Sequence, residues 1–334
     1  MSDEVKKREG GFTLIEILVA LAILTIAAAP MLYVTAGAQR LAHSQSEAAD
    51  LHQRARVIAE KIQRDIAMAG AGPPLDLPLG SLSAYIPAVI PARTGARSPD
   101  AALTAFDDRC SIVYVPDDGW SARLAVDMPD QSAGIAIDAS IPGCPAAGLC
   151  GFTAGTRALI LDTTVAGAGH DAFSVTALDA ELAHGPPNPP LSKAYGAATA
   201  RVMPIVQRVY HFDRAARRLM LYDGYQSDVP LVDNVVDARF EYFVDAAGGV
   251  GPRRIALTEL IDGPVAGLPP NQFDRDLLRI RLMRVTLRLQ AAADDVRGGG
   301  AWFARPGRST SGYSLVPDVE VSFDVALRNA RGGS

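Results

Sequence analysis

The carboxylate of Glu16 is the most unusual group in the sequence, because it lies at the start of a long apolar run. From Ile17 to Ala38, 22 residues carry no charged side chain. An acid at mid-bilayer costs about 2.5–3.5 kcal/mol on insertion scales, so such a residue is a functional-site hypothesis and needs a partner. Cleavage between Gly11 and Phe12 would supply one, because a free α-amine titrates near pH ~8. Glu16 follows Phe12 by one helical turn, so the two groups share a helix face.

The chain changes character at this bond. Residues 1–11 are polar and include Lys6, Lys7 and Arg8 just before two glycines. The apolar run that follows is long enough for a helix to cross the hydrocarbon core, and the preceding basic residues favour a cytoplasmic N-terminus. We therefore expect a leader of residues 1–11 followed by a membrane-spanning helix.

An ordinary secretory signal peptide is the alternative interpretation, because Ala27, Ala28 and Ala29 supply a matching cleavage site. Three features argue against it. Pro30 would directly follow the cut, the apolar run continues to Val34, and an acid stands at the start of the apolar region. We favour cleavage after Gly11; a mature chain that begins at Pro30 would overturn this choice.

Residues 11–16, Gly-Phe-Thr-Leu-Ile-Glu, resemble the cleavage and N-methylation motif of type IV prepilins and type II secretion pseudopilins. In that family Gly precedes the cut, the first mature residue is usually Phe and the fifth is Glu, which match Gly11, Phe12 and Glu16. The resemblance implies cleavage by a prepilin peptidase and methylation of the Phe12 amine. It also implies that Glu16 neutralises a neighbour's N-terminal amine and so sets subunit register. The motif covers only the beginning of the chain.

Helical periodicity continues beyond the apolar run. Between residues 51 and 69, apolar residues recur at spacings of three or four while charged residues fall mostly elsewhere. This pattern predicts an amphipathic helix whose apolar stripe packs on the remaining chain. Gly70, Gly72 and Pro73 are expected to end it. Pro30 predicts a kink, because proline removes one backbone hydrogen bond of the helix.

The later sequence is mainly β in pattern. Short apolar or alternating runs predict strands at 111–115, 158–161, 172–178, 205–212, 218–222, 235–244, 278–289 and 319–327. Their one-sided alternation is typical of antiparallel sheets, and residues 213–217 predict a hairpin turn. The expected fold class is α+β, with a long N-terminal helix packed on a mainly antiparallel, pilin-like head. We expect three parts: leader 1–11, helix 12–70 and head 71–334.

Three further stretches carry looser resemblances. Residues 55–70 and 323–329 are similar to the corresponding regions of PilW-type minor pilins. Residues 231–243 are similar both to that group and to the J-type minor pseudopilins of type II secretion. The head is also larger than a major pilin would need, which favours a minor subunit.

The three cysteines leave their pairing open. Cys144 and Cys150 enclose a short loop, and a disulfide between them requires an oxidising compartment. The alternative is three reduced thiols, with Cys110 as the third. The cysteines lack the spacing of a zinc site, so no structural metal is expected.

The head carries no recognisable catalytic motif, so we do not expect an enzyme. Its histidines are scattered, and a structural role is expected for His211, which lies in a predicted strand. Acids at 117–118 and 127–130 raise a calcium hypothesis, but they lack the spacing of an EF-hand and are better interpreted as solvated loop residues. No other cofactor is expected.

The charge distribution argues against nucleic-acid binding. The net charge is −5, whereas non-specific binding to nucleic acid needs a broad basic surface. Four arginines, at positions 279, 281, 284 and 288, are interpreted as the solvent face of a strand rather than a DNA contact.

The sequence therefore predicts a single-pass protein of the bacterial inner membrane with a periplasmic head. We expect it to join the major pilin and other minor pilins in a type IV pilus, as a minor pilin that primes assembly and helps form the tip. A J-type minor pseudopilin of a type II secretion system is the first alternative. A membrane-tethered periplasmic binding or enzymatic domain is the second.

Overall fold

The computed structural model describes residues 12–73, 77, 80–116, 120–140, 144, 149–164, 168–186, 188–246, 251–309 and 314–330. The expected leader, with Gly11, and the acids at 117–118 lie outside these residues. The chain forms two compact units. Unit one combines Met1–Asp50 with Ala291–Pro317, and unit two combines Leu51–Gln290 with Asp318–Ser334.

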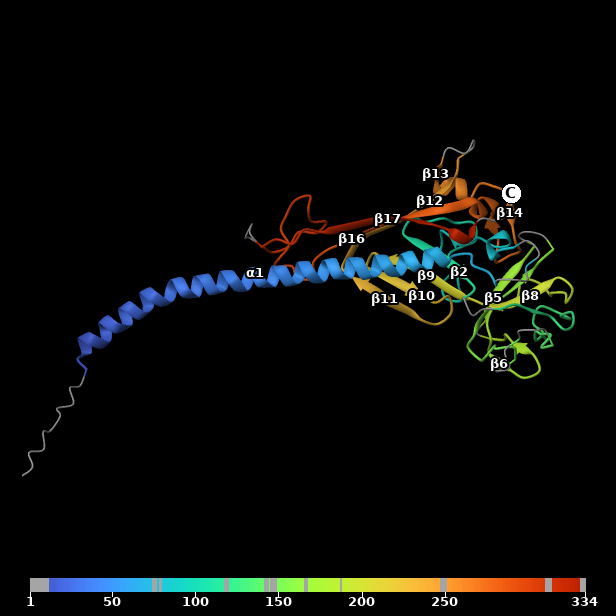
Figure 1. Cartoon of the computed structure of the whole chain (residues 1–334), viewed down its shortest axis with the longest axis horizontal. Helices are drawn as coiled ribbons and strands as arrows, with labels where there is room; N and C mark the ends of the chain where they lie inside the picture. Colours follow the sequence, from blue (N-terminus) through green and yellow to red (C-terminus); the bar gives the residue numbers. More distant parts are fainter. Residues whose placement is uncertain are drawn as a thin grey trace, which may run out of the picture. The chain divides into compact units, whose positions relative to one another are not determined.

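A single long helix, α1, runs from Leu14 to Met68 over 55 residues. At 1.5 Å per residue it is about 83 Å long. It is the blue ribbon in Figure 1. The helix continues through Pro30, and the kink expected there stays a prediction. Together with the antiparallel sheets described next, α1 confirms the predicted α+β class.

Unit two contains three larger antiparallel sheets. The five-stranded sheet has the order β1-β2-β9-β10-β11, and the two four-stranded sheets have the orders β13-β12-β16-β17 and β3-β8-β4-β5. The bounds are β1 Val89–Ile90, β2 Arg109–Tyr114, β3 Ala122–Arg123, β4 Arg157–Asp162, β5 His170–Ser174, β8 Ala200–Pro204, β9 Val206–Asp213, β10 Arg218–Tyr222, β11 Asp228–Asp233, β12 Val235–Asp245, β13 Pro252–Ile255, β16 Ile280–Leu289 and β17 Val319–Ala326.

Short elements complete unit two. Two-stranded sheets pair β6 (Ala177–Leu178) with β7 (Leu182–Ala183), and β14 (Val265–Ala266) with β15 (Phe273–Asp274). The 3-10 helices are η1 Leu82–Ala84, η2 Leu257–Leu260, η3 Arg275–Arg279 and η4 Arg328–Ala330.

The strongest strand predictions are confirmed with small shifts. β9 and β10 pair from Asp213 opposite Arg218, so the predicted hairpin is present. Its turn is held by the backbone N–H of Ala216, which donates to Oδ1 of Asp213 at 2.9 Å. The prediction of one strand over 172–178 is wrong, since the chain there divides into β5 and β6. The strand expected from residue 278 starts at Ile280 because η3 occupies the preceding residues.

The apolar stripe in the second half of α1 lies in the core of unit two, as predicted. Its members are all less than a tenth exposed: Leu51, Ala55, Ile58, Ala59, Ile62 and Ile66. Ala69, directly after the helix, is buried as well. Nη1 of Arg54 in this part of the helix donates to the backbone oxygen of Asp233 in β11 at 3.3 Å, and β10 and β9 continue the same sheet (Figure 1). The stripe therefore holds the helix onto the sheets by burial of apolar surface.

A buried carboxylate adds a specific contact between helix and sheet. Asp65 of α1 is 7% exposed, and its Oδ2 accepts a 2.5 Å hydrogen bond from the hydroxyl of Tyr210 in β9. Nζ of Lys61 and Nε of Arg208 lie 3.8 and 3.9 Å from the same oxygen. The charge of Asp65 is thus balanced by two cations and one strong donor, as a buried charge requires.

The end of α1 is closed by the C-terminal part of the chain. Gly70 adopts φ +72° and donates its N–H to the oxygen of Val113 in β2 at 2.9 Å. The side-chain amide of Asn329 lies 3.4 Å from the oxygen of Met68, and the backbone oxygen of Asn329 accepts from the hydroxyls of Ser81 and Ser83. The last carbonyls of the helix therefore gain a partner that folds back from η4.

We predict that Tyr210→Phe destabilises the protein by about 2 kcal/mol, because Asp65 would lose its strongest donor while staying buried. Arg56→Ala is the control, since Arg56 forms an exposed ion pair with Glu60 on the same helix and should change stability by less than about 0.5 kcal/mol. Urea unfolding of the full chain in detergent measures both. Equal stability of the two variants would show that the contact between Asp65 and Tyr210 contributes little.

Candidate functional site

The first turn of α1 is closed by a reciprocal pair of hydrogen bonds. Oε2 of Glu16 accepts from the backbone N–H of Thr13 at 2.9 Å and from its hydroxyl at 2.9 Å. In return the backbone N–H of Glu16 donates to Oγ1 of Thr13 at 3.4 Å. Since α1 begins at Leu14, Thr13 occupies the N-cap and Glu16 the third helical position, which is the arrangement of a capping box.

This cap fixes where the Glu16 carboxylate points. It reaches back toward the start of the chain and bonds the amide of Thr13, whose nitrogen is one residue beyond that of Phe12. The acid is therefore held at the amide of the residue that follows Phe12. Phe12 itself is 85% exposed.

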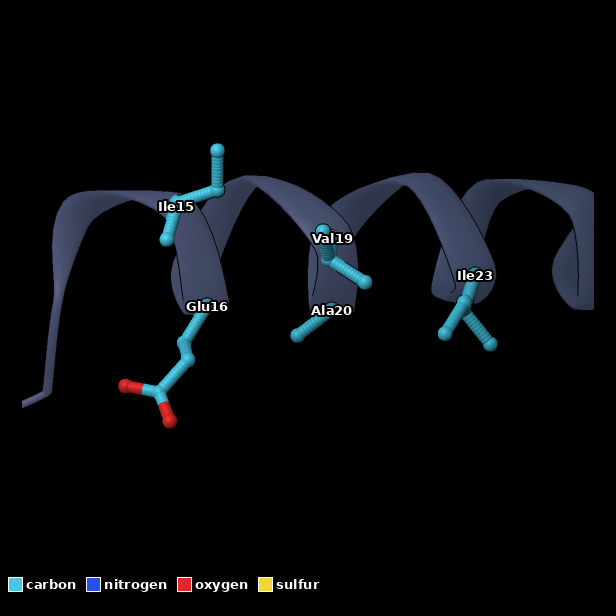
Figure 2. A pocket seen from close by; sticks show the side chains of 5 residues that line it. All are labelled: Ile15, Glu16, Val19, Ala20 and Ile23. Carbon is cyan, nitrogen blue, oxygen red and sulfur yellow. The ribbon is translucent and has the colours of Figure 1, made fainter.

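A shallow depression follows Glu16 along the same helix. Its lining consists of Ile15, Glu16, Val19, Ala20 and Ile23. Figure 2 shows the Glu16 and Ala20 side chains leaving the same side of the ribbon, one turn apart. Because Ala20 is small, it leaves room beside the carboxylate, and branched apolar side chains border that space.

The first half of α1 is apolar on all its sides. Its large side chains are about half to four-fifths exposed, among them Leu14, Ile17, Leu21, Leu24, Ile26, Met31 and Val34. Its most apolar window has a mean hydropathy of 2.5 and is 0% buried inside the protein. A helix that is apolar all round needs a surrounding of lipid or of other helices. By length and composition, this segment is able to span a membrane.

The two cysteines that enclose the short loop are joined in the structure. Cys144 and Cys150 form a disulfide with their Cα atoms 4.8 Å apart. Cys110 in β2 is buried with a free thiol, and its burial raises the pKa of that thiol. A buried thiol of this kind is inert rather than nucleophilic.

The residues considered for metal binding have other roles. Oδ1 of Asp127 accepts from the backbone of Ala197 at 2.7 Å, and Oδ1 of Asp130 accepts from the backbone of Ser132 at 2.7 Å. Within the part of the chain that the structure describes, no group of three or more His, Cys, Asp and Glu residues is placed to hold a metal ion. The calcium hypothesis therefore gains no site among these residues.

His211 has the structural role expected of it. Its Nε2 lies 3.0 Å from Oδ1 of Asp228 and 2.9 Å from Nη1 of Arg93. Burial lowers the pKa of His211 more than its hydrogen bond with Asp228 raises it. The ring links β9 to the edge strand β11.

The four arginines of the β16 region are engaged in ion pairs. Arg284 forms two bonds with Asp324 across to β17, at 2.7 and 2.9 Å. The remaining pairs are Arg279 with Asp276, Arg281 with Asp245 and Arg288 with Asp318. Each cation therefore has an acid beside it, and the four do not form an unbalanced basic strip.

A buried acid in the β5 sheet was not found from the sequence. Asp171 is 4% exposed, and it accepts hydrogen bonds from the backbone and hydroxyl of Ser192, the hydroxyl of Tyr195 and the amide of Asn271 at 2.7–2.8 Å. Burial raises the pKa of Asp171, although the hydrogen bonds from these donors act to lower it. Asn271 is 100 residues away in the sequence, so no local pattern could reveal this network. Its geometry is that of a structural link between loops.

Comparison with known proteins gives one match at the N-terminus. Residues 6–32 match the family model described as the prokaryotic N-terminal methylation motif. Among solved structures, the chain is similar to a type IV-like pilin from Thermus thermophilus at 15% identity and a TM-score of 0.20, over 52% of this chain and 86% of that chain. No curated protein matches the chain. The capped start of α1 therefore lies within a stretch that matches a prokaryotic N-terminal methylation motif.

Proposed function

We propose that this chain is a minor pilin of a type IV pilus. A prepilin peptidase cuts between Gly11 and Phe12, the new amine of Phe12 is methylated, and α1 packs among other subunits in the filament. The observation that carries the proposal is the capped carboxylate of Glu16 at the start of a helix that is apolar and exposed on all its sides.

The pairing of Glu16 with a neighbour's amine follows from electrostatics. An unpaired carboxylate surrounded by apolar helices loses its hydration without compensation, and breaking a buried ion pair costs about 3–5 kcal/mol. A neighbouring subunit whose Phe12 amine meets Glu16 removes this cost. A subunit shifted along the axis by one turn does not remove it, so the ion pair selects one register.

Features of the head support two parts of the proposal: that the head lies outside the cytoplasm, and that the protein is a minor subunit. A disulfide such as Cys144–Cys150 persists in oxidising compartments, of which the bacterial periplasm is one. The basic leader favours a cytoplasmic N-terminus. The proposed topology is therefore a single pass through the inner membrane with the head in the periplasm. The many strands and loops of unit two offer the extended surface that a tip subunit needs for its partners.

Glu16→Gln separates the charge of this residue from its capping role. Glutamine is accepted at the third position of a capping box, so the helix start is preserved while the charge is lost. We expect normal cleavage but at least a ~10-fold loss of incorporation into filaments, the ratio that ~1.4 kcal/mol produces. Immunoblots of sheared filaments against cell extracts measure this ratio.

Thr13→Val is the matched control, because it removes the capping hydroxyl and keeps the charge. It should cost about 1 kcal/mol of local helix stability and leave incorporation near the wild-type level. If Thr13→Val loses incorporation and Glu16→Gln does not, capping rather than charge pairing explains Glu16. Counting pili and assaying protein secretion in the same strains separates a pilus from a pseudopilus: the proposal requires that piliation is lost while secretion continues.

We predict that Gly11→Leu blocks processing, because a bulky residue before the cut would clash with a peptidase site that accepts glycine. The precursor should accumulate in the membrane with slower gel mobility than the mature chain. Gly10→Leu, one residue further from the cut, is the control and should be processed. Unchanged mobility of Gly11→Leu would place the cut elsewhere.

A charge within the apolar run should weaken membrane anchoring. Leu24→Arg places a cation near the middle of the run, which costs about 2.5–3.5 kcal/mol on insertion scales. Leu41→Arg makes the same change on α1 beyond the run, at a half-exposed residue, and should have little effect. The fraction of chain that resists alkaline extraction from membranes measures both. Equal extraction of the two variants would contradict a membrane span at residues 17–38.

A further inference from the structure

The connection between β16 and β17 packs on α1 near the middle of the helix, at His43 and Glu47. Residues 291–317 belong to unit one together with the start of the helix. Oε2 of Glu47 accepts from the backbone N–H groups of Ala292 and Ala293 at 3.1 and 3.2 Å. One turn earlier, Nε2 of His43 lies 3.5 Å from Oδ1 of Asp295. The segment is therefore fastened to one face of the helix at two successive turns.

The segment also holds its own shape. The side chain of Arg308 forms two bonds with the carboxylate of Asp294, at 2.7 and 3.0 Å. We call residues 294–298 and 307–316 its two arms. The N–H of Val316 donates to the oxygen of Val296 at 2.8 Å, and the N–H of Gly307 donates to the oxygen of Gly298 at 3.1 Å. Phe303, which lies between the arms in the sequence, is 8% exposed. The residues between the arms are thus carried on an ordered base.

A tryptophan stands exposed at the end of this segment. Residues 299–306, Gly-Gly-Ala-Trp-Phe-Ala-Arg-Pro, contain no acid, and we call them the tip. The tip turns at Gly300, which has φ +98° and accepts from the N–H of Phe303 at 3.1 Å. Trp302 is 75% exposed, and Arg305 is also exposed. The acids of the segment lie outside the tip, where Asp294 and Asp295 bind other groups. The tip is therefore aromatic and cationic.

The attachment point lies just beyond the apolar run. His43 and Glu47 follow Ala38 by five and nine residues, which is about 8 and 14 Å along a helix. The headgroup layer adds roughly 5–8 Å on each side of a hydrocarbon core of about 30 Å. Four residues lead from Asp295 to Gly299, and four extended residues span at most about 14 Å. The distance from the attachment point back to the headgroup layer of a membrane that α1 spans is therefore within the length of this part of the chain.

We propose that the tip rests in the headgroup layer of the membrane, with Trp302 at the interface and Arg305 beside lipid phosphate. Tryptophan collects at membrane interfaces because its ring is apolar and its N–H needs a polar partner. The proposal rests on the proposed function in one respect, since α1 must be inserted. The tip then gives the unassembled subunit a second contact with the membrane. This contact is lost when the subunit enters a filament.

The two tryptophans of the chain allow a direct test. Trp120→Phe leaves Trp302 as the single indole. Trp302→Phe is the matched control and leaves Trp120, whose ring packs edge-on against Phe152 at 4.9 Å in the head. Each full-length variant is reconstituted in vesicles of phosphatidylcholine and phosphatidylglycerol. The phosphatidylcholine is brominated either near the headgroup or near the chain ends, and insertion of α1 is measured separately by alkaline extraction.

We expect Trp302 fluorescence to be quenched by bromine near the headgroup more than by bromine near the chain ends, while Trp120 is quenched by neither. If the chain resists extraction but Trp302 is quenched only by aqueous acrylamide, the tip does not lie on the membrane, although the proposed anchoring stands. If the chain is extracted, both the membrane contact and the membrane span are wrong. Equal quenching of the two variants would also overturn the proposal, because Trp302 would then be no closer to the lipid than Trp120.

Discussion

The burial of one stripe of α1 in the core of unit two is the constraint on which the rest of this structure depends. Leu51, Ile62 and Ile66 are fully buried, and Asp65 is matched by Tyr210 in β9. The same continuous helix is apolar and exposed on all sides in its first half. One helix therefore serves two surroundings: a folded β-rich core for one half and lipid or neighbouring helices for the other.

The start of this helix combines local stability with a fixed charge. Thr13 and Glu16 satisfy each other's backbone N–H groups, as the ends of helices require. The same bonds hold the carboxylate at the beginning of α1, four residues after Phe12, whose amine cleavage after Gly11 would create. Capping and charge pairing are compatible, because the cap positions the acid before any neighbour arrives.

Periodicity in the sequence predicted the helices and strands in which apolar and polar residues alternate regularly. The stripe at 51–69 and the alternation in β17 identify a buried helix face and a strand, and the hairpin at Asp213 follows from its flanking strands. β11 was not predicted, because Pro230 interrupts it and because it lies at the edge of its sheet. The Asp171 network and the contact of Glu47 with Ala292 join residues 21–245 positions apart, which no local pattern encodes.

The sequence revealed the unusual charge of Glu16, but the hydrogen bonds that hold its carboxylate were not predicted. An acid inside an apolar run stands out by composition. The match of residues 6–32 to a methylation motif agrees with the interpretation of Glu16 as part of such a motif. The spacing Thr13-x-x-Glu16 is also a signature of a capping box, a signal that the sequence contained and that the charge argument left unused. By contrast, the exposure of Trp302 depends on how residues 291–317 fold against α1, and composition cannot reveal it.

The most direct measurement is the mass and sequence of the N-terminal peptide of the mature protein, purified from its native host. Our account predicts a chain that starts at Phe12 and carries a methyl group on its α-amine. A mature chain that still begins at Met1 would contradict it, because no new amine would have formed near Glu16. A mature chain that begins at Pro30 would also contradict it, because Glu16 would have been removed.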